Sequence, residues 1–214
     1  TTLWLRNEDA AREINDTHHN EQYLPGVKLN PELKASVSLQ QAVTGADAIF
    51  VSVPSKSVRE VVASFHQWLT PEQALISTTK GIEPEGFKLM SQVLSELCPD
   101  NPIGVLSGPN LAKEIAKREL AATVFASENS DLRRNLQQAL SCDYFRVYAS
   151  NDLYGVELSG ALKNIYAIVS GFVAALGMGE NTKAMIITRS LAEMSRFAVS
   201  QGANPLTFLG LAGV

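Results

Sequence analysis

Short apolar runs that alternate with helical patterns constrain the fold of this chain most strongly. The runs, rich in β-forming residues, cover residues 2–5, 48–53, 74–78, 103–106 and 122–125. Most are apolar throughout, as expected for strands whose two faces are both covered by helices. Helical spacing of apolar residues separates them at residues 57–68, 84–97 and 130–140. The pattern predicts an α/β fold with a doubly wound, Rossmann-type parallel sheet.

The character of the chain changes near Asn151, after one more predicted strand at residues 144–148. From there we predict one long helix to about residue 176, a glycine-rich break at residues 177–179, and a second helix over residues 182–200. No strand pattern follows. We therefore predict a sheet domain over residues 1–150 and the start of an all-helical second domain over residues 151–214.

The first residues match the second strand of such a sheet. A doubly wound sheet normally opens with a strand, a Gly-x-Gly-x-x-Gly turn that receives a dinucleotide pyrophosphate, and a helix. We expect roughly 25 to 30 residues of a first βα unit to be missing. The chain stops at residues 208–214 in a glycine-rich stretch. We expect a fragment that lacks both ends and is at risk of being inactive.

Composition and charge exclude several classes of protein. The formal net charge is −4 and no basic block exceeds two residues, which argues against nucleic acid as a partner. Cys98 and Cys142 lie far apart in no metal-ligand spacing, and no signal peptide is recognisable, so we expect idle thiols in a reducing cytoplasm. The longest apolar stretch, residues 165–178, falls short of the roughly 20 residues of a membrane span, and we predict a core helix there.

Arg6 and Asn7 follow the first predicted strand, where a dinucleotide-binding fold contacts the adenosine ribose. An arginine there suits the 2′-phosphate of NADP, whereas an acidic residue would bind the 2′-hydroxyl of NAD. The sequence thus favours NADP. A solvated arginine is the simpler reading, and Glu8 and Asp9 could serve NAD or start a helix.

Two further polar segments follow predicted strands. Lys80 comes at the carboxyl end of the third run, where ligands of open α/β sheets bind and where an ammonium suits a phosphate. Residues 107–114 (SGPNLAKE) follow the fourth run and open a predicted helix, whose N–H groups could bind an anion beside Gly108. The alternatives are a solvated loop lysine for Lys80 and a simple helix N-cap for Asn110.

Lys163 lies within the long predicted helix among small and apolar neighbours, so we expect it to be buried. Burial lowers a lysine pKa toward neutrality, which suits proton transfer when a carbonyl is reduced to an alcohol. Asn164, with Ser159 and Gly160 one turn back, could orient the amine or a substrate oxygen. The alternative is a structural lysine paired with Glu157 or another carboxylate.

Together these segments resemble the bacterial-type NAD(P)-dependent glycerol-3-phosphate dehydrogenase family. The matching stretches are residues 3–6, 20–26, 77–83, 106–114, 156–164, 179–184 and 188–194. They occur in order over nearly the whole chain. No single stretch is specific, but the ordered set is.

The resemblance implies a cytoplasmic enzyme that transfers hydride reversibly between NAD(P)H and dihydroxyacetone phosphate, giving sn-glycerol 3-phosphate for phospholipid synthesis. It makes Lys163 the general acid/base and places Lys80 between nicotinamide and substrate. It assigns further substrate contacts to Gly108 and Asn110, although relatives often carry serine at position 110. The cofactor contacts that it implies are Arg6, Asn7, Tyr23, Lys80 and Ala112.

The chain departs from the family pattern at both ends. It lacks the Gly-rich turn for the pyrophosphate, and it lacks the Asp and the Arg-Asn pair that the family places after a Gly-Asp-Leu motif to bind the substrate phosphate. One rival is another 6-phosphogluconate-like dehydrogenase, such as a β-hydroxyacid dehydrogenase or ketopantoate reductase. A second is a non-catalytic remnant that acts as an interaction module. The oligomeric state stays open, with a homodimer as one option.

Overall fold

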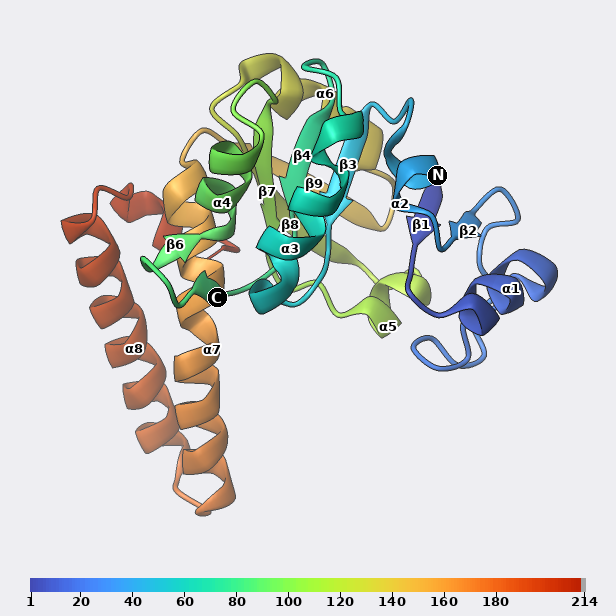
Figure 1. Ribbon diagram of the computed structural model, residues 1–214. Coiled ribbons are helices and arrows are strands. Elements are labelled where there is room, and N and C mark those ends of the chain that lie inside the picture. Colours follow the sequence, from blue (N-terminus) through green and yellow to red (C-terminus); the bar gives the residue numbers. More distant parts are fainter. Residues whose placement is uncertain (213–214) are drawn as a thin grey trace.

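The strands form one five-stranded sheet and two small sheets in the computed structural model, which describes residues 1–212 (Figure 1). The large sheet has the order β3 (Ala48–Val51), β4 (Ala74–Ser77), β7 (Ile103–Ser107), β8 (Ala121–Ala126) and β9 (Phe145–Ser150). A parallel pair joins β1 (Thr2–Trp4) to β2 (Lys34–Ser36), and an antiparallel hairpin joins β5 (Ile82–Glu83) to β6 (Lys88–Leu89). All six predicted strands are present.

Helices cover both faces of the large sheet. In chain order the helices of residues 1–212 are α1 (Glu8–Thr17), α2 (Leu39–Val43), α3 (Ser55–Phe65), η1 (His66–Trp68), α4 (Met90–Leu97), α5 (Ala112–Ala116), α6 (Ser130–Leu140), α7 (Leu153–Ala175), α8 (Glu180–Ser200) and η2 (Pro205–Leu209). In β4, Leu75 packs in a core with α3 and α4, whereas Ile76 packs in a core with α6. Because successive side chains of a strand point to opposite faces, both faces of β4 are buried. The predicted doubly wound architecture is confirmed.

Two strands, β8 and β9, run opposite to the direction that an all-parallel sheet requires. β3, β4 and β7 are parallel and β8 is parallel to β9, but β7 pairs with β8 in the antiparallel sense. A parallel connection needs a crossover, usually through a full helix. Between β7 and β8 the chain carries only the five-residue α5, so it turns back along the sheet instead of crossing over.

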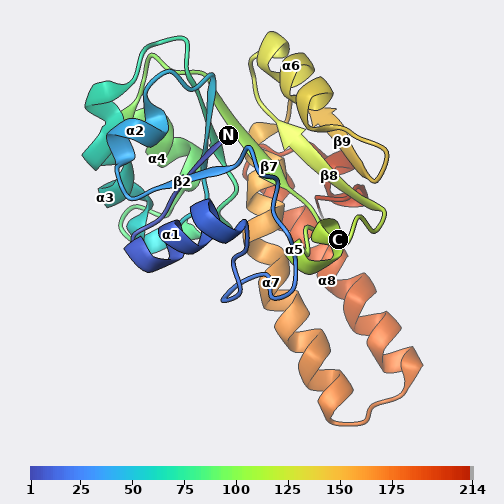
Figure 2. The ribbon, with the colours of Figure 1, turned by 90° about the vertical axis from the view of Figure 1, so that its right-hand side faces the viewer.

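The long helix α7 is a core helix only over its first part. Val156 packs with Val105 and Val124 of the sheet, and Leu158 packs with Met194 of α8. Farther along, Ile168 is 72% exposed, where α7 and α8 run as a hairpin away from the sheet (Figure 2). The expectation of a core helix over residues 165–178 is therefore wrong for most of that stretch. Among the described residues α7 alone is long and apolar enough to cross a membrane, by length and composition only.

The predicted helix over residues 84–97 begins later than expected. Residues 82–89 form the β5–β6 hairpin, and α4 starts at Met90. At the hairpin turn, Gly86 and Phe87 have φ angles of 86° and 52°, in the left-handed region that a right-handed helix cannot contain. The helical spacing of apolar residues in this segment is thus interrupted by backbone conformation.

Candidate functional site

Lys80 lies directly beyond the carboxyl end of β4, as predicted. Before it, the Thr79 hydroxyl donates to the carbonyl of Val53 over 2.7 Å. The ammonium of Lys80 reaches across to the neighbouring strand and donates to the carbonyl of Gly108 over 3.3 Å. Burial lowers the pKa of Lys80, although part of the side chain remains exposed. Lys80 is thus an exposed lysine whose ammonium is held at the sheet edge by a hydrogen bond to the neighbouring strand's end.

The segment after β7 brings buried polar atoms to the same edge. A Cβ at Gly108 would lie 3.0 Å from the Cα of Thr123, so close packing against β8 accounts for this glycine. The Asn110 amide donates to the Thr123 hydroxyl over 3.0 Å. The Asn110 Oδ1 and Ser107 Oγ atoms are buried without a hydrogen-bond partner in residues 1–212. Buried polar atoms normally have partners, so two such atoms side by side mark this edge of the sheet as a candidate site.

The helix predicted after residue 110 is too short for the role that the sequence suggests. α5 has five residues, and Leu111 occupies its N-cap position without a side-chain cap. Asn110 is therefore not an N-cap, and its contact with Thr123 explains its orientation. Nor does one turn of helix offer the anion site that we expected there, because the helix dipole needs aligned peptide units.

Lys163 on α7 lies close to Lys80. Gly160, one turn earlier on the helix, is so near the sheet edge that a Cβ there would lie 2.5 Å from the Ser107 hydroxyl and 4.0 Å from the Cγ of Lys80. Burial lowers the pKa of Lys163, and the charge of Lys80 lowers it further. Lys163 is partly buried, less than its apolar neighbours in sequence suggested. The fold thus brings together two cations that are 83 positions apart.

Glu157 has a role that the sequence did not reveal. Its side chain is buried, 4% exposed, and its carboxylate accepts from the backbone N–H of Ser91 over 2.9 Å and from the Ser91 hydroxyl. It thereby joins α7 to the first turn of α4. Burial raises the pKa of Glu157 to about 7. Asn164, another predicted helper of the lysine, is exposed.

The predicted cofactor residues are all exposed, Lys80 included. Arg6 follows β1 and is exposed, and Tyr23 is 68% exposed in the loop after α1. The Asn7 side chain accepts from the N–H of Ala10 over 3.0 Å and so caps α1. Ala112 is the exposed first residue of α5. An exposed guanidinium, an exposed aromatic ring and the Lys80 ammonium fit the phosphates and base of a dinucleotide in charge and chemistry.

Two hollows of the surface lie elsewhere. One of about 340 Å³ lies between α1 and β2, and one of about 490 Å³ lies over Ser55, Arg59 and Glu83. Neither is lined by Lys80 or Lys163.

These features define the class: a Rossmann-type α/β protein with helices after the sheet and a pair of lysines at the carboxyl edge. Residues 1–133 match the family described as NAD-dependent glycerol-3-phosphate dehydrogenase N-terminus, and residues 152–214 match its C-terminus. The chain belongs to the NAD-dependent glycerol-3-phosphate dehydrogenase family.

Named relatives agree with this placement. A glycerol-3-phosphate dehydrogenase [NAD(P)+] of Alcanivorax borkumensis is 55% identical over 99% of this chain and 62% of its own length. One of Acinetobacter baylyi is 56% identical over 100% of this chain and 60% of its own length. The crystal structure of a glycerol-3-phosphate dehydrogenase from Coxiella burnetii superposes with a TM-score of 0.93 at 34% identity, covering 99% of this chain and 65% of that one. The chain thus spans about three fifths of the length of the curated relatives.

Proposed function

We propose that this chain carries the reacting residues of an enzyme that reduces dihydroxyacetone phosphate to sn-glycerol 3-phosphate with NAD(P)H, reversibly, for phospholipid synthesis. The observation that carries the proposal is the pair of coupled lysines, Lys80 and Lys163, at the carboxyl edge of a Rossmann-type sheet. Membership of the glycerol-3-phosphate dehydrogenase family supports it.

Lys163 is the proton donor in this proposal. When the substrate carbonyl accepts a hydride, its oxygen gains negative charge and needs a proton. The Lys163 ammonium donates that proton to the oxygen and becomes a neutral amine, which water reprotonates. Burial and the nearby charge of Lys80 lower the pKa of Lys163, so its proton leaves more readily than that of an exposed lysine. In the reverse direction the neutral amine takes the hydroxyl proton.

Lys80 and the polar atoms beside it hold the substrate. The Lys80 ammonium already has one acceptor in the Gly108 carbonyl, and its remaining N–H groups can bind a substrate oxygen. The Oδ1 atom of Asn110 is an acceptor only, so it suits a substrate hydroxyl that donates. Together these groups would bind the hydroxyl and the carbonyl of a small phosphorylated ketone.

A dinucleotide would bind through Arg6, Asn7, Tyr23, Lys80 and Ala112. Bound NADPH or NADH supplies the hydride. Arg6 favours NADP, because its exposed guanidinium can pair with a 2′-phosphate. We place dinucleotide binding in residues 1–150 and the start of the substrate domain in residues 151–214. The proposed location is the cytoplasm.

The test is an assay of dihydroxyacetone-phosphate-dependent NADPH oxidation. Residues 1–214 replace the aligned part of the Alcanivorax borkumensis relative, and the chimera is compared with its Lys163→Ala and Lys183→Ala variants. We expect Lys163→Ala to lower kcat about 10²- to 10⁴-fold, the usual contribution of general acid catalysis, and Lys183→Ala to have little effect. Equal rates in all three would remove Lys163 from the mechanism. Turnover of a β-hydroxyacid instead of the ketone phosphate would favour the rival dehydrogenases.

A further inference from the structure

The backbone on both sides of Lys80 is attached to one neighbouring unit, β3 with α3. On the side before Lys80, the Thr79 hydroxyl donates to the Val53 carbonyl, which follows β3. Directly after it, Gly81 lies so close to α3 that a Cβ there would be 2.7 Å from the Ser55 side chain. From this unit the Lys80 side chain extends toward Gly160 of α7 and the Gly108 carbonyl. The backbone at Lys80 is therefore anchored on β3 and α3.

The strongest of these attachments joins Arg59 of α3 to Glu83 of β5. The Arg59 Nε atom donates to Glu83 Oε1 over 2.7 Å, and a terminal guanidinium nitrogen donates to Oε2 over 3.0 Å. Glu83 is only 15% exposed, so this fork is shielded from water on the side of the carboxylate. Two parallel hydrogen bonds fix the direction of both planes as well as their distance. The chain three residues after Lys80 is thus held in one orientation.

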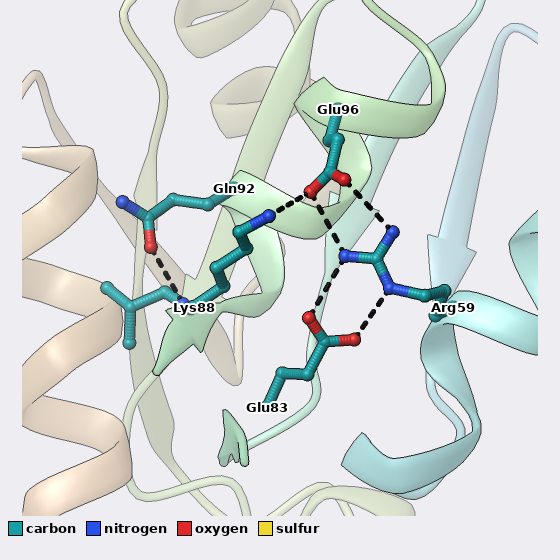
Figure 3. A network of polar contacts seen from close by, with 6 residues as sticks. Arg59, Glu83, Lys88, Gln92 and Glu96 are labelled. Atoms are coloured by element: carbon teal, nitrogen blue, oxygen red, sulfur yellow. Dashed lines mark hydrogen bonds and ion pairs between the residues drawn. The ribbon is translucent and has the colours of Figure 1, made fainter. Parts of the chain in front are cut away.

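The same guanidinium also binds α4. Its two terminal nitrogens donate to the Glu96 carboxylate over 3.3 and 3.0 Å, and Lys88 of β6 donates to Glu96 over 2.6 Å. Figure 3 shows Arg59 between the two carboxylates, with Lys88 on the other side of Glu96. Glu96 is 44% exposed and belongs to the helix after the hairpin, not to the strand that leads out of Lys80. Arg59 therefore makes two ion pairs, of which only the one with Glu83 lies in the strand that follows Lys80.

The hairpin also contacts the helices that carry Lys163. Leu89 of β6 is buried in a cluster with Leu158 of α7 and Met194 of α8, and Ile82 of β5 packs against the same cluster. The hairpin is thus held on one side by Arg59 and on the other by the helical region. A rotation of the hairpin would move the backbone at Lys80 relative to α7.

We propose that Arg59, acting through Glu83, is a positioning residue that holds Lys80 beside Lys163. Its consequence for catalysis rests on the proposed function, whereas the contacts that hold Lys80 do not depend on any reaction. Arg59 touches neither lysine in the contacts described above, so its effect is indirect. The partly exposed ion pairs around it contribute little to global stability, which makes a local role testable without unfolding the chain.

The experiment measures the protonation of Lys80 directly in the 214-residue chain. The rate of Lys80 acetylation is followed by peptide mass spectrometry from pH 7 to pH 11, and the midpoint of its pH dependence gives the pKa. Glu83→Gln removes the ion pair on the path to Lys80, and Glu96→Gln is the matched control on the same guanidinium. Arg59→Lys is a second variant, which keeps the positive charge but cannot make the two parallel hydrogen bonds to Glu83. Cooperative thermal unfolding confirms that each variant is folded.

We expect the Lys80 midpoint to rise by about half a pH unit or more in Glu83→Gln and Arg59→Lys, because a displaced Lys80 is better solvated. Glu96→Gln should leave it unchanged. An unchanged midpoint in both Glu83→Gln and Arg59→Lys would overturn the proposal, as would an equal rise in Glu96→Gln. Because no substrate or cofactor takes part, a failed assay of the proposed reaction does not affect this result. A failure of this experiment likewise leaves the proposed reaction untested by it and unchanged.

Discussion

Lys163 lies close to Lys80, and its pKa is lowered by burial and further by the charge of Lys80, although the two residues come from different parts of the fold. Lys80 follows a strand of the sheet, and Lys163 lies on the long helix that leaves it. Burial lowers the pKa of both amines, and at Lys163 the like charge of Lys80 acts in the same direction. The pair can therefore bind anionic or electron-rich oxygen atoms, while one member gives up its proton.

Replacing Lys80 by methionine should raise the pKa of Lys163. The substitution keeps an unbranched side chain but removes the positive charge that disfavours protonation of Lys163. The pH dependence of Lys163 acetylation, measured by mass spectrometry, should shift upward. Lys113→Met, an exposed lysine on α5, serves as the control and should leave the Lys163 midpoint in place. A downward shift in Lys80→Met would contradict the electrostatic account.

Glu157 should make the chain less stable as pH rises through neutrality. Burial raises its folded pKa to about 7, above the ordinary value, so the folded state holds a proton that the unfolded state has already lost. Between about pH 4.5 and 7 the free energy of unfolding should therefore fall with pH, by up to about 1.4 kcal/mol per pH unit. Urea unfolding at several pH values measures this slope.

Glu157→Gln should flatten that slope, because glutamine does not titrate. Ser91→Ala provides the control: it keeps the carboxyl group but removes a hydroxyl that favours the charged form, so the slope should extend to higher pH. If wild type and Glu157→Gln kept the same slope over this range, the stability change would belong to another group.

Arg6→Ala should change the preference between the two cofactors. The exposed guanidinium can pair with the 2′-phosphate of NADP, which NAD lacks. In the chimera with the Alcanivorax borkumensis relative, we expect KM for NADPH to rise about tenfold or more and KM for NADH to change little, since a charged hydrogen bond contributes roughly 1.5 to 3 kcal/mol. Arg12→Ala, another exposed arginine on α1, is the control. Equal rises for both cofactors would exclude 2′-phosphate recognition.

The order of strands and helices could be predicted because it follows from local patterns. Residues 130–140 carry a helical spacing after Asn129, and α6 occupies that same range with Asn129 as its cap. The reversal at β8 could not be predicted, because strand direction depends on how the connecting chain folds over the sheet. The hairpin at residues 82–89 could not be predicted either, because its apolar spacing suits a helix. Only the left-handed backbone at Gly86 and Phe87 excludes a helix there.

At the site, the sequence indicated Lys80, Gly108, Asn110 and Lys163, but not the burial of the Ser107 hydroxyl beside them. A lysine after a strand or within an apolar helix stands out in the sequence, whereas nothing in the sequence shows that the Ser107 hydroxyl is buried. That hydroxyl becomes notable only when α7 lies against the strand. Arg59 was overlooked for the same reason, because an arginine in an amphipathic helix reads as solvated until its two carboxylates are in place. The assignment of cofactor contacts to Asn7 and Tyr23 stays a prediction.

Because α7 lies close to β7 at only one of its glycines, we expect alanine substitutions at Gly160 and Gly171 to change stability in opposite directions. In a helix interior, alanine is favoured over glycine by about 0.8 to 1 kcal/mol. At Gly171 a Cβ would meet nothing within 4 Å, so Gly171→Ala should stabilise the chain by about that amount. At Gly160 the new Cβ would lie 2.5 Å from the Ser107 hydroxyl, and we expect Gly160→Ala to destabilise the chain by about 1 to 3 kcal/mol, as for overpacked sites.

Urea unfolding of both variants measures the difference in the free energy of unfolding. Adding Ser107→Gly to Gly160→Ala should restore most of the lost stability. A stabilising Gly160→Ala would mean that α7 lies farther from the strand, and the lysine pair would then be farther apart as well.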